Sequence, residues 1–476
     1  MRMIWVSIAT LLIFNSSVFA QSIEERIKTL EDALKKQEQT IKEQQKIIEE
    51  LKAEIKKVKS EEQQQAAQPK EAPSLAAKEA EKKATLEQVQ QQVQQLKEEV
   101  GQVVEAQKKN VLSIFNPAIG LVGESILSYR TRGSNETGSD RPGGFDFFQR
   151  SVELNVAASV DPFAKAYAVI NASADPVTGE AKAVVEEAAI QTTSLPWNLT
   201  LKAGRFFGEF GRLSYIHDHE LPFVNRPLAL DQYVGGESKT DGVQVNFLVP
   251  ISHYVSLTAG VGDQFGDVPN NVGNFRHFRD LNFWGRASTY FDLTPDVSLE
   301  TGMSGLWNPR TQDRGGVFVQ PDGSTLTERR RLLLGGDLVV RYWPLRNNQF
   351  RNLIWGTELL FSDNRYLVNP GIPKAPMFNR SVNSFGLYSY LAYRFHRQWS
   401  VGFLFDYVEN AQNNRDLTFA YSPFITWAIS HWNQLRLQYT HTTRNSIAGS
   451  PLRGDDAIYL QWAWIIGSHA HGWQER

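Results

Sequence analysis

Polar and apolar residues alternate in short runs that recur about every 20 residues over the last three-quarters of the chain. In residues 281–291 most odd positions are apolar, whereas Asn282, Arg286 and Ser288 occupy even positions. Successive side chains of a β-strand point to opposite faces, so a period of two predicts a strand with one apolar and one polar face. Residues 332–342 repeat the pattern, and this region is therefore predicted to be all-β.

Clusters of Pro, Gly, Asn and Asp separate these runs and define sixteen candidate strands. The candidates are residues 119–130, 147–160, 164–174, 183–193, 199–207, 243–249, 254–261, 281–291, 297–307, 329–342, 353–361, 383–395, 399–407, 417–427, 435–443 and 458–466. Tight turns such as 161–162 alternate with long connections such as 263–280 and 364–382. This alternation and an even strand number are typical of an outer-membrane β-barrel. The predicted fold is an all-β transmembrane barrel of about 16 antiparallel strands, preceded by an α-helical coiled coil.

Aromatic residues favour a membrane barrel over a soluble one, because membrane barrels carry aromatic girdles at both interfaces. Phe, Trp and Tyr make up 11% of the chain, more than a soluble barrel could accommodate inside. Those expected at strand ends or on the lipid face are Trp343, Trp355, Tyr388, Tyr390, Tyr393, Phe395, Trp399, Tyr421, Trp427, Trp432, Trp462 and Trp464.

The first residues resemble a secretory signal at 1–20, with a charged start, an apolar stretch at 4–14 and small residues before Gln21. The apolar stretch is short for a membrane span, so the mature protein is predicted to be exported. The chain has no cysteine, which excludes disulfides and thiolate metal sites. A formal net charge of -2 offers no basic surface for nucleic acid.

Residues 21–60 keep an unbroken 4-3 spacing of mainly Ile and Leu, which predicts a periplasmic coiled coil. A flexible linker at 61–85 and a second coiled-coil segment at 86–112 lead into the predicted barrel at 113–476. A single helix would leave its apolar seam in water. We therefore expect the chain to pair with copies of itself, most simply as a homotrimer.

The longest connection, residues 208–241, follows the fifth predicted strand and mixes Arg, His and acidic residues with aromatic ones. Loops of this length are usually functional. We expect this loop to fold into the barrel and narrow it, and the alternative is a loop packed over the mouth. Its expected constriction residues are Arg212, His217, His219 and Glu220. Ordinary imidazoles would gain charge there near pH 6.

The run from His217 to Glu220 also supplies imidazole and carboxylate groups, which are common zinc ligands. A third partner at a fixed spacing is missing from the sequence around this run. The sequence therefore predicts neither a metal site nor a cofactor.

Further residues lining the channel follow from strand parity, because a Lys or Arg facing lipid at mid-membrane would cost roughly 2–4 kcal/mol. The inward cations include Lys202, Arg286, Arg341, Arg394 and Arg436. The inward anions by the same criterion are Glu124, Glu153, Glu187, Glu300, Asp337, Glu358 and Asp406.

The end of the fifth predicted strand resembles the phosphate-selective porin O and P family, whose pattern there is roughly Gly-x-Phe-Lys-x-Pro-Phe-Gly. The residues that match are Gly204, Phe206, Phe210 and Gly211. Phe207 and Glu209 stand where the family has Lys and Pro, so phosphate selectivity is not carried over. A coiled coil ahead of a barrel also resembles trimeric porins that have such an extension, and the resemblance implies a porin fold.

These features predict a porin, a passive diffusion channel for small hydrophilic solutes or ions, surrounded by outer-membrane lipid. The alternative is a structural tether, because the first helical segment would extend roughly 57 Å at 1.5 Å per residue and could reach the peptidoglycan of the cell wall. No enzyme is expected. Ser430 and His431 supply a nucleophile and a base, but adjacent strand residues point to opposite faces.

Overall fold

The computed structural model describes residues 117–467 apart from 138, 140, 176–177, 268–275, 310–316, 321–322, 347–349 and 446–451. The predicted signal sequence, both coiled-coil segments and their linker lie outside the described residues. Within the described part of the chain, no helix is both long enough and apolar enough to cross a membrane.

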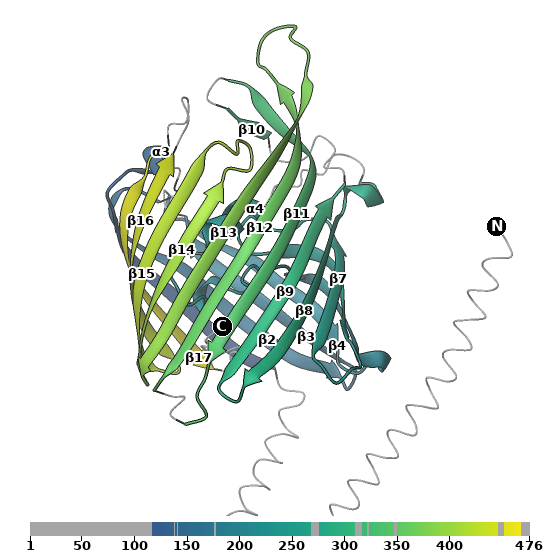
Figure 1. Ribbon diagram of the computed structural model, residues 1–476, viewed down its shortest axis with the longest axis vertical. Helices are drawn as coiled ribbons and strands as arrows, with labels where there is room; N and C mark the ends of the chain where they lie inside the picture. The colour runs from purple at the N-terminus through teal and green to yellow at the C-terminus, as the bar shows by residue number, and fades with distance from the viewer. Residues whose placement is uncertain are drawn as a thin grey trace, which may run out of the picture. The chain divides into compact units, whose positions relative to one another are not determined.

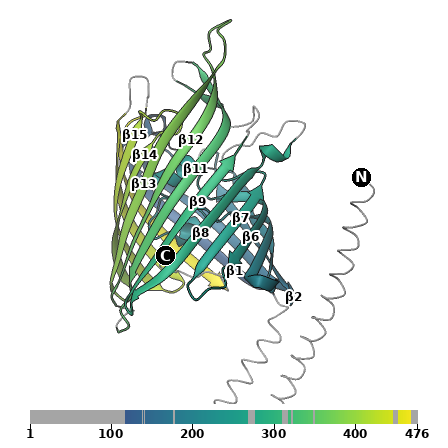
Figure 2. The same cartoon turned by 45° about the vertical axis from the view of Figure 1, so that its right-hand side comes forward.

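Antiparallel strands form a closed barrel (Figure 1, Figure 2). The sheet contains 17 strands, and one of them, the short β10, pairs with β11 beyond the segment that pairs with β9, which leaves sixteen in the ring. Each strand of the ring pairs with the next one along the chain. Strand β1 closes the ring because it pairs with both β2 and β17.

The strands are β1 Ala118–Arg130, β2 Gly144–Asp161, β3 Ala164–Ala174, β4 Ala181–Thr192, β5 Leu199–Phe207, β6 Lys239–Leu248, β7 Val255–Gly262, β8 Asn282–Thr294, β9 Val297–Asn308, β10 Val317–Val319, β11 Thr325–Tyr342, β12 Asn352–Asn369, β13 Phe378–His396, β14 Trp399–Glu409, β15 Leu417–Ser430, β16 Asn433–Asn445 and β17 Asp455–Gly467. The short helices are α3 Ser134–Thr137, α4 Leu228–Tyr233, η1 Pro196–Asn198, η2 Asp218–Glu220 and η3 Phe278–Asp280.

All sixteen predicted strands are present, so the predicted barrel is confirmed. The loop predicted at 364–382 is too long, since β12 continues to Asn369 and β13 begins at Phe378, and this hairpin projects beyond the neighbouring strands (Figure 1). In this extension Tyr366 and Val368 pack against Leu326 in a small buried cluster. The Asn, Pro and Gly residues of the stretch have the composition of a loop, which obscured the alternation.

The two faces of the wall differ as a membrane barrel requires, and β12 shows the difference clearly. Ile354, Glu358 and Leu360 are buried inside the ring. Their neighbours Leu359 and Phe361 are 48% and 41% exposed on the outer face. Exposed apolar side chains of this kind recur around the barrel, and such a surface is stable against lipid rather than against water.

Two aromatic residues lie on the opposite face from the one predicted. Tyr388 and Tyr390 are buried inside the ring, so their assignment to the lipid face or a strand end is wrong. The Tyr388 hydroxyl donates to Glu358 Oε2 at 2.6 Å. The Tyr390 ring packs against Phe223 of the long loop, with ring centroids 5.6 Å apart. A water-filled lumen would offer these rings no apolar contacts. The apolar residues of the long loop provide such contacts inside the ring, and this is why the tyrosines can face inward.

Candidate functional site

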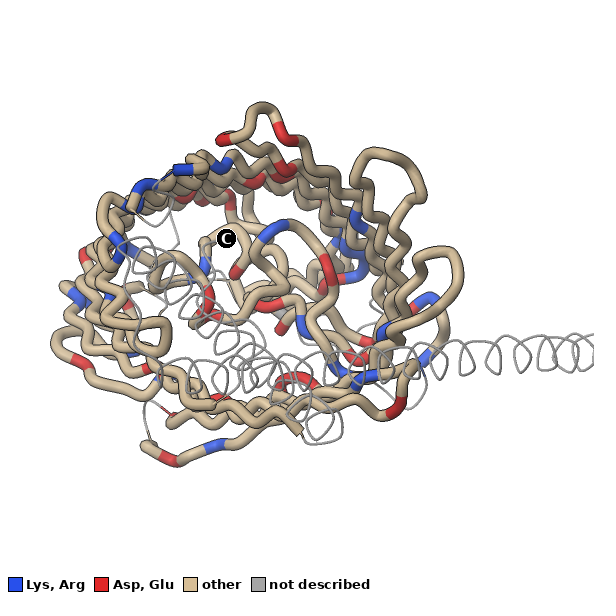
Figure 3. The backbone as a smooth tube through the Cα atoms, turned by 90° about the horizontal axis from the view of Figure 1, so that it is seen from below, with Lys and Arg blue, Asp and Glu red and all other residues tan. Residues whose placement is uncertain are grey.

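The connection between β5 and β6, residues 208–238, lies inside the barrel, and we call it the inner loop. Seen along the barrel axis, the backbone crosses the interior of the ring (Figure 3). The Val224 amide donates to Gln438 Oε1 of β16 at 2.7 Å, and the Leu228 amide donates to Asp406 Oδ1 of β14 at 3.0 Å. Because the inner loop leaves the wall at β5, these contacts show that it reaches across the lumen.

The inner loop turns into the lumen at Gly211. This residue has a φ of +60°, a conformation that glycine adopts more readily than other residues. Its amide donates to Ser304 Oγ at 2.9 Å, and the next amide, that of Arg212, donates to Glu358 Oε2 at 3.0 Å. A Cβ on Gly211 would overlap the Glu358 carboxylate. The turn therefore favours glycine for two reasons: the backbone has a positive φ, and the Glu358 carboxylate leaves no room for a Cβ.

An apolar core holds the inner loop against wall residues from β4 round to β15. Phe223 packs edge-on against Tyr390 of β13 and Phe424 of β15, with centroids 5.6 Å and 6.3 Å away. The buried inner-loop members of this core are Phe210, Leu213, Ile216, Leu221, Phe223, Ala229, Leu230, Tyr233 and Val234. Full burial of one Leu or Phe side chain stabilises a fold by about 1.5–3 kcal/mol, so this core keeps the inner loop inside the barrel.

Arg226 ties the inner loop to itself. Its guanidinium donates to the carbonyl oxygens of Leu213 at 2.7 Å and Ile216 at 2.6 Å, and it also pairs with Asp218 at 2.7 Å. Hydrogen bonds from a charged donor contribute about 1.5–3 kcal/mol each. The inner loop is thus a compact unit of its own, held together around one arginine.

Predicted lumen charges meet in pairs beside the start of the inner loop. Arg212 donates to Glu300 Oε1 at 2.9 Å, and Arg341 donates to Glu300 Oε2 at 3.1 Å. Nearby, Arg286 donates to Asp337 Oδ1 at 2.9 Å. Strand parity had placed the wall residues of these pairs inward. The partner of each cation depends on the register of β8, β9 and β11 and, for Arg212, on the position of the inner loop.

Toward β2 and β4, the inner loop also meets the wall through an ionic cluster. His217 Nε2 lies 3.0 Å from Glu187 Oε1 of β4, and His217 Nδ1 lies 3.5 Å from Glu153 Oε2 of β2. Glu186 Oε2 is 3.6 Å from the same Nδ1. His219 Nδ1 lies 3.1 Å from Glu153 Oε1. All five side chains are buried or nearly so.

The ionic cluster changes the protonation of both imidazoles. Burial alone would lower the pKa of His217, but Glu153, Glu186 and Glu187 outweigh burial and raise that pKa well above its ordinary value. The pKa of His219 is likewise raised, since the charge of Glu153 outweighs the effect of burial. In the absence of another cation, the two rings therefore carry positive charge to a higher pH than ordinary histidines do.

A β-bulge explains why two consecutive glutamates face the same histidine. The register of β3 with β4 shifts between Val169 and Ile170, where Val169 pairs with Glu187 and Ile170 pairs with Val185. Glu186 is the extra residue, and the bulge lets both carboxylates point inward. Strand parity identified Glu187 and missed Glu186, because a bulge leaves no distinct signal in this sequence.

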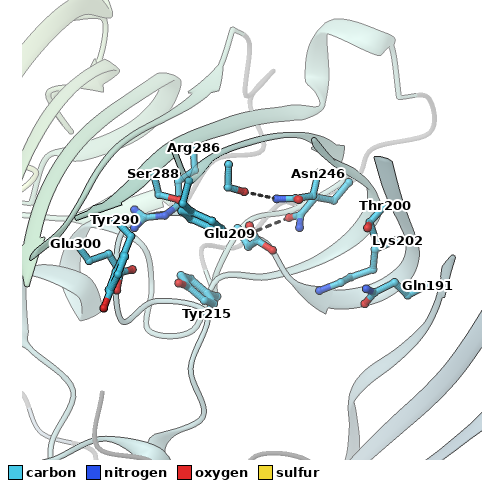
Figure 4. Close-up of a pocket in the computed structure, with 13 residues that line it drawn as sticks. Gln191, Thr200, Lys202, Glu209, Tyr215, Asn246, Arg286, Ser288, Tyr290 and Glu300 are labelled. Carbon is cyan, nitrogen blue, oxygen red and sulfur yellow. Dashed lines mark hydrogen bonds between the residues drawn. The ribbon is translucent and has the colours of Figure 1, made fainter. Parts of the chain in front are cut away.

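Open space remains around the inner loop in at least three cavities. A cavity of about 600 Å³, the Lys202 cavity, lies near the tight turns. Lys202 of β5, Arg286 of β8 and Glu300 of β9 point toward it together with Tyr215 and Glu209 of the inner loop (Figure 4). Its charges are two basic and two acidic, so the cavity is nearly neutral.

Two further cavities border other parts of the inner loop. The Arg226 cavity, of about 730 Å³, lies toward the long loops and is lined by seven basic and five acidic residues. The Arg436 cavity, of about 830 Å³, lies near the tight turns and includes Glu220 and Arg394. The Arg436 guanidinium donates to the Phe223 carbonyl at 3.2 Å. Neither His217 nor His219 lines any of these three cavities.

The sequence was compared with family models and with known proteins. No family model matches the chain, so its resemblance to phosphate-selective porins stays a prediction. An uncharacterized protein of Aquifex aeolicus is 25% identical over 366 residues, which cover 72% of each chain.

Among solved structures, the chain is similar to Pseudomonas putida OprB, with a TM-score of 0.50, 12% identity, and coverage of 76% of this chain and 96% of OprB. The outer membrane channel DcaP of Acinetobacter baumannii gives a TM-score of 0.49 at 8% identity, covering 74% of this chain and 97% of DcaP. The chain has the fold of a porin-like barrel.

Proposed function

We propose that the protein is an outer-membrane channel through which small hydrophilic solutes or ions diffuse. The observation that carries the proposal is the contrast between the two faces of one closed ring. The outer face is apolar, whereas the inner face borders cavities of about 600, 730 and 830 Å³ lined by charged and polar groups. A structural anchor would need the outer face but not a charged, hydrated interior.

The inner loop is proposed to set the narrowest part of the path. It borders all three cavities, so a solute that passes through the barrel must pass beside it. Lys202 and Arg286 line one cavity, and Arg394, Arg436 and Glu220 line another. These residues are the proposed contacts of the solute. Arg212 and Arg341 influence the path indirectly, by holding the carboxylate of Glu300. His217 and His219 contribute by holding the inner loop against the wall.

The test of channel activity is conductance of the purified full-length protein in planar lipid bilayers. We expect stable current steps whose size is proportional to voltage, because the lumen holds hydrated charges. Insertion is verified independently by protease protection of the barrel in the same lipid. Bilayers that contain inserted barrel and remain silent would contradict the proposal.

The protein is further proposed to be a homotrimer in the outer membrane. The heptads of residues 21–60 support a homotrimer with a periplasmic helical region. Light scattering in mild detergent should give three chains per particle for the full chain, and a monomer would contradict this assignment. The tether to peptidoglycan stays a prediction from the sequence, tested by co-sedimentation of the full chain with isolated cell wall.

A further inference from the structure

The sequence alone predicted no metal site, since the His217–His219 pair lacked a third ligand. The structure supplies that ligand from β2. One nitrogen of His217, one nitrogen of His219 and one oxygen of Glu153 all lie within 4.8 Å of one another, and all three side chains are buried. We propose that Glu153, His217 and His219 bind a divalent transition-metal ion such as Zn²⁺, which fastens the inner loop to the wall.

The observed spacings are close to those of a metal site. Zinc binds imidazole nitrogen and carboxylate oxygen at about 2.0–2.2 Å, so the ligand atoms of a tetrahedral site lie roughly 3.3 Å apart. His219 Nδ1 is 3.1 Å from Glu153 Oε1, and His217 Nδ1 is 3.5 Å from Glu153 Oε2. Because the ligand atoms lie within 4.8 Å of one another, side-chain rotation that brings the two nitrogens and one oxygen together would complete the three-ligand set.

Two buried atoms point independently to a ligand. Glu153 is 2% exposed and His217 is 6% exposed. Glu153 Oε2 and His217 Nδ1 face each other at 3.5 Å, an ion-pair distance, but neither atom makes a well-formed hydrogen bond among the described residues. Ligation of one cation by both atoms would replace this long contact with two short bonds.

The surroundings of His217 match those of metal-bound histidines. Such rings usually donate their other N–H to a carboxylate, which fixes the tautomer and the orientation. His217 Nε2 lies 3.0 Å from Glu187 Oε1, which leaves Nδ1 for the ion. Glu187 is itself held, because the Tyr167 hydroxyl donates to its Oε2 at 3.0 Å. Glu187 is thus a positioning residue.

The fourth ligand would be Glu186 or water. Glu186 Oε2 lies 3.6 Å from His217 Nδ1, and Lys239 Nζ lies 3.8 Å from Glu186 Oε1. Two neutral imidazoles with two carboxylates balance the charge of a divalent ion. A set of two nitrogen and two oxygen ligands suits Zn²⁺ better than Ca²⁺ or Mg²⁺, which prefer oxygen alone.

The test uses the full-length protein purified without a histidine tag and stripped with a chelator. Co²⁺ is added while visible absorption is recorded, and Zn²⁺ binding is measured by competition. We expect one equivalent per chain and the intense absorption of tetrahedral Co²⁺. The double variant H217Q/H219Q should lose this spectrum, and E153Q should weaken binding at least tenfold. The exposed-histidine variant H441Q, whose ring pairs with Asp456, should bind like the unchanged protein.

E187Q separates a metal site from a merely structural cluster, because it leaves every proposed ligand in place. It should bind Zn²⁺ about 10–100-fold more weakly and still give the tetrahedral spectrum. Folding of each variant is checked by the shift in gel mobility on heating. Absence of tetrahedral Co²⁺ in the unchanged protein, or equal binding by a folded H217Q/H219Q or E153Q variant, would overturn the proposal.

Discussion

The inner loop meets the barrel wall in two different ways. Toward β13 and β15 it presents apolar residues such as Phe223, which are fully buried. Toward β2 and β4 it presents His217 and His219 to three glutamates. Apolar packing depends little on pH or ions, whereas an ionic cluster depends on both. The difference suggests a fixed attachment through the apolar core and an adjustable one through the ionic cluster.

The largest effect should come from breaking the apolar attachment. Phe223→Ala removes a fully buried ring and should destabilise the barrel by about 3–5 kcal/mol, since the cavity left behind is lined by other rings. Guanidinium unfolding followed by tryptophan fluorescence measures the loss. The control is Phe361→Ala on the outer face, where the ring is 41% exposed to lipid or detergent. Equal losses for the two variants would refute a dominant apolar attachment.

A smaller effect is expected from the charges beside the Lys202 cavity. Asp337→Asn leaves Arg286 without the carboxylate that it contacts at 2.9 Å. It should cost about 3 kcal/mol, the lower end for breaking a buried ion pair, because Asn keeps an oxygen that can accept from Arg286. The uncompensated guanidinium should also move the reversal potential toward anions. Asp161→Asn is the control, because it makes the same charge change at an exposed turn residue that lines none of the three cavities. An unchanged reversal potential for Asp337→Asn would place the path elsewhere.

The smallest effect concerns pH in the metal-free protein. The pKa of His217 is raised in the folded state, so the folded protein holds this proton more tightly than the unfolded chain does. The resulting stability is fully present below the unfolded pKa of about 6.5 and is lost as pH rises through the raised folded value. The slope is at most about 1.4 kcal/mol per pH unit for one proton.

His217→Gln should remove this slope, and chelator-treated protein scanned by thermal unfolding at rising pH measures it. A variant with the same pH profile as the unchanged protein would show that the ionic side is not adjustable in this way. The imidazole charge expected to appear near pH 6 is therefore present up to a higher pH, on side chains that line none of the three cavities.

The wall of the barrel could be predicted from the sequence because its signal is local. Alternation places Arg286 and Glu358 inward whatever their partners are, since side-chain direction depends only on position within the strand. The β12–β13 extension escaped because loop-forming residues interrupt the alternation there. Local periodicity therefore predicts the number of strands and the face to which each side chain points, but it does not predict where a hairpin ends.

The contacts of the inner loop could not be predicted, because they join residues far apart in the sequence. His217 and His219 were recognised as a pair, and Glu153 and Glu187 as inward anions. Nothing in the sequence relates the first pair to the second, and the bulge at Glu186 breaks the parity rule. The apolar residues of the inner loop were visible, yet their packing against Tyr390 reversed the expected orientation of that tyrosine.

The central claim is that the inner loop restricts a channel. The most direct measurement is the single-channel conductance of a variant in which residues 212–234 are replaced by a short Gly-Ser linker, compared with the unchanged protein under the same salt and voltage. Removal of the segment that crosses the lumen should raise the conductance several-fold in variant barrels that heat-modifiability gels show to be folded. A folded variant whose conductance equals that of the unchanged protein would contradict the account.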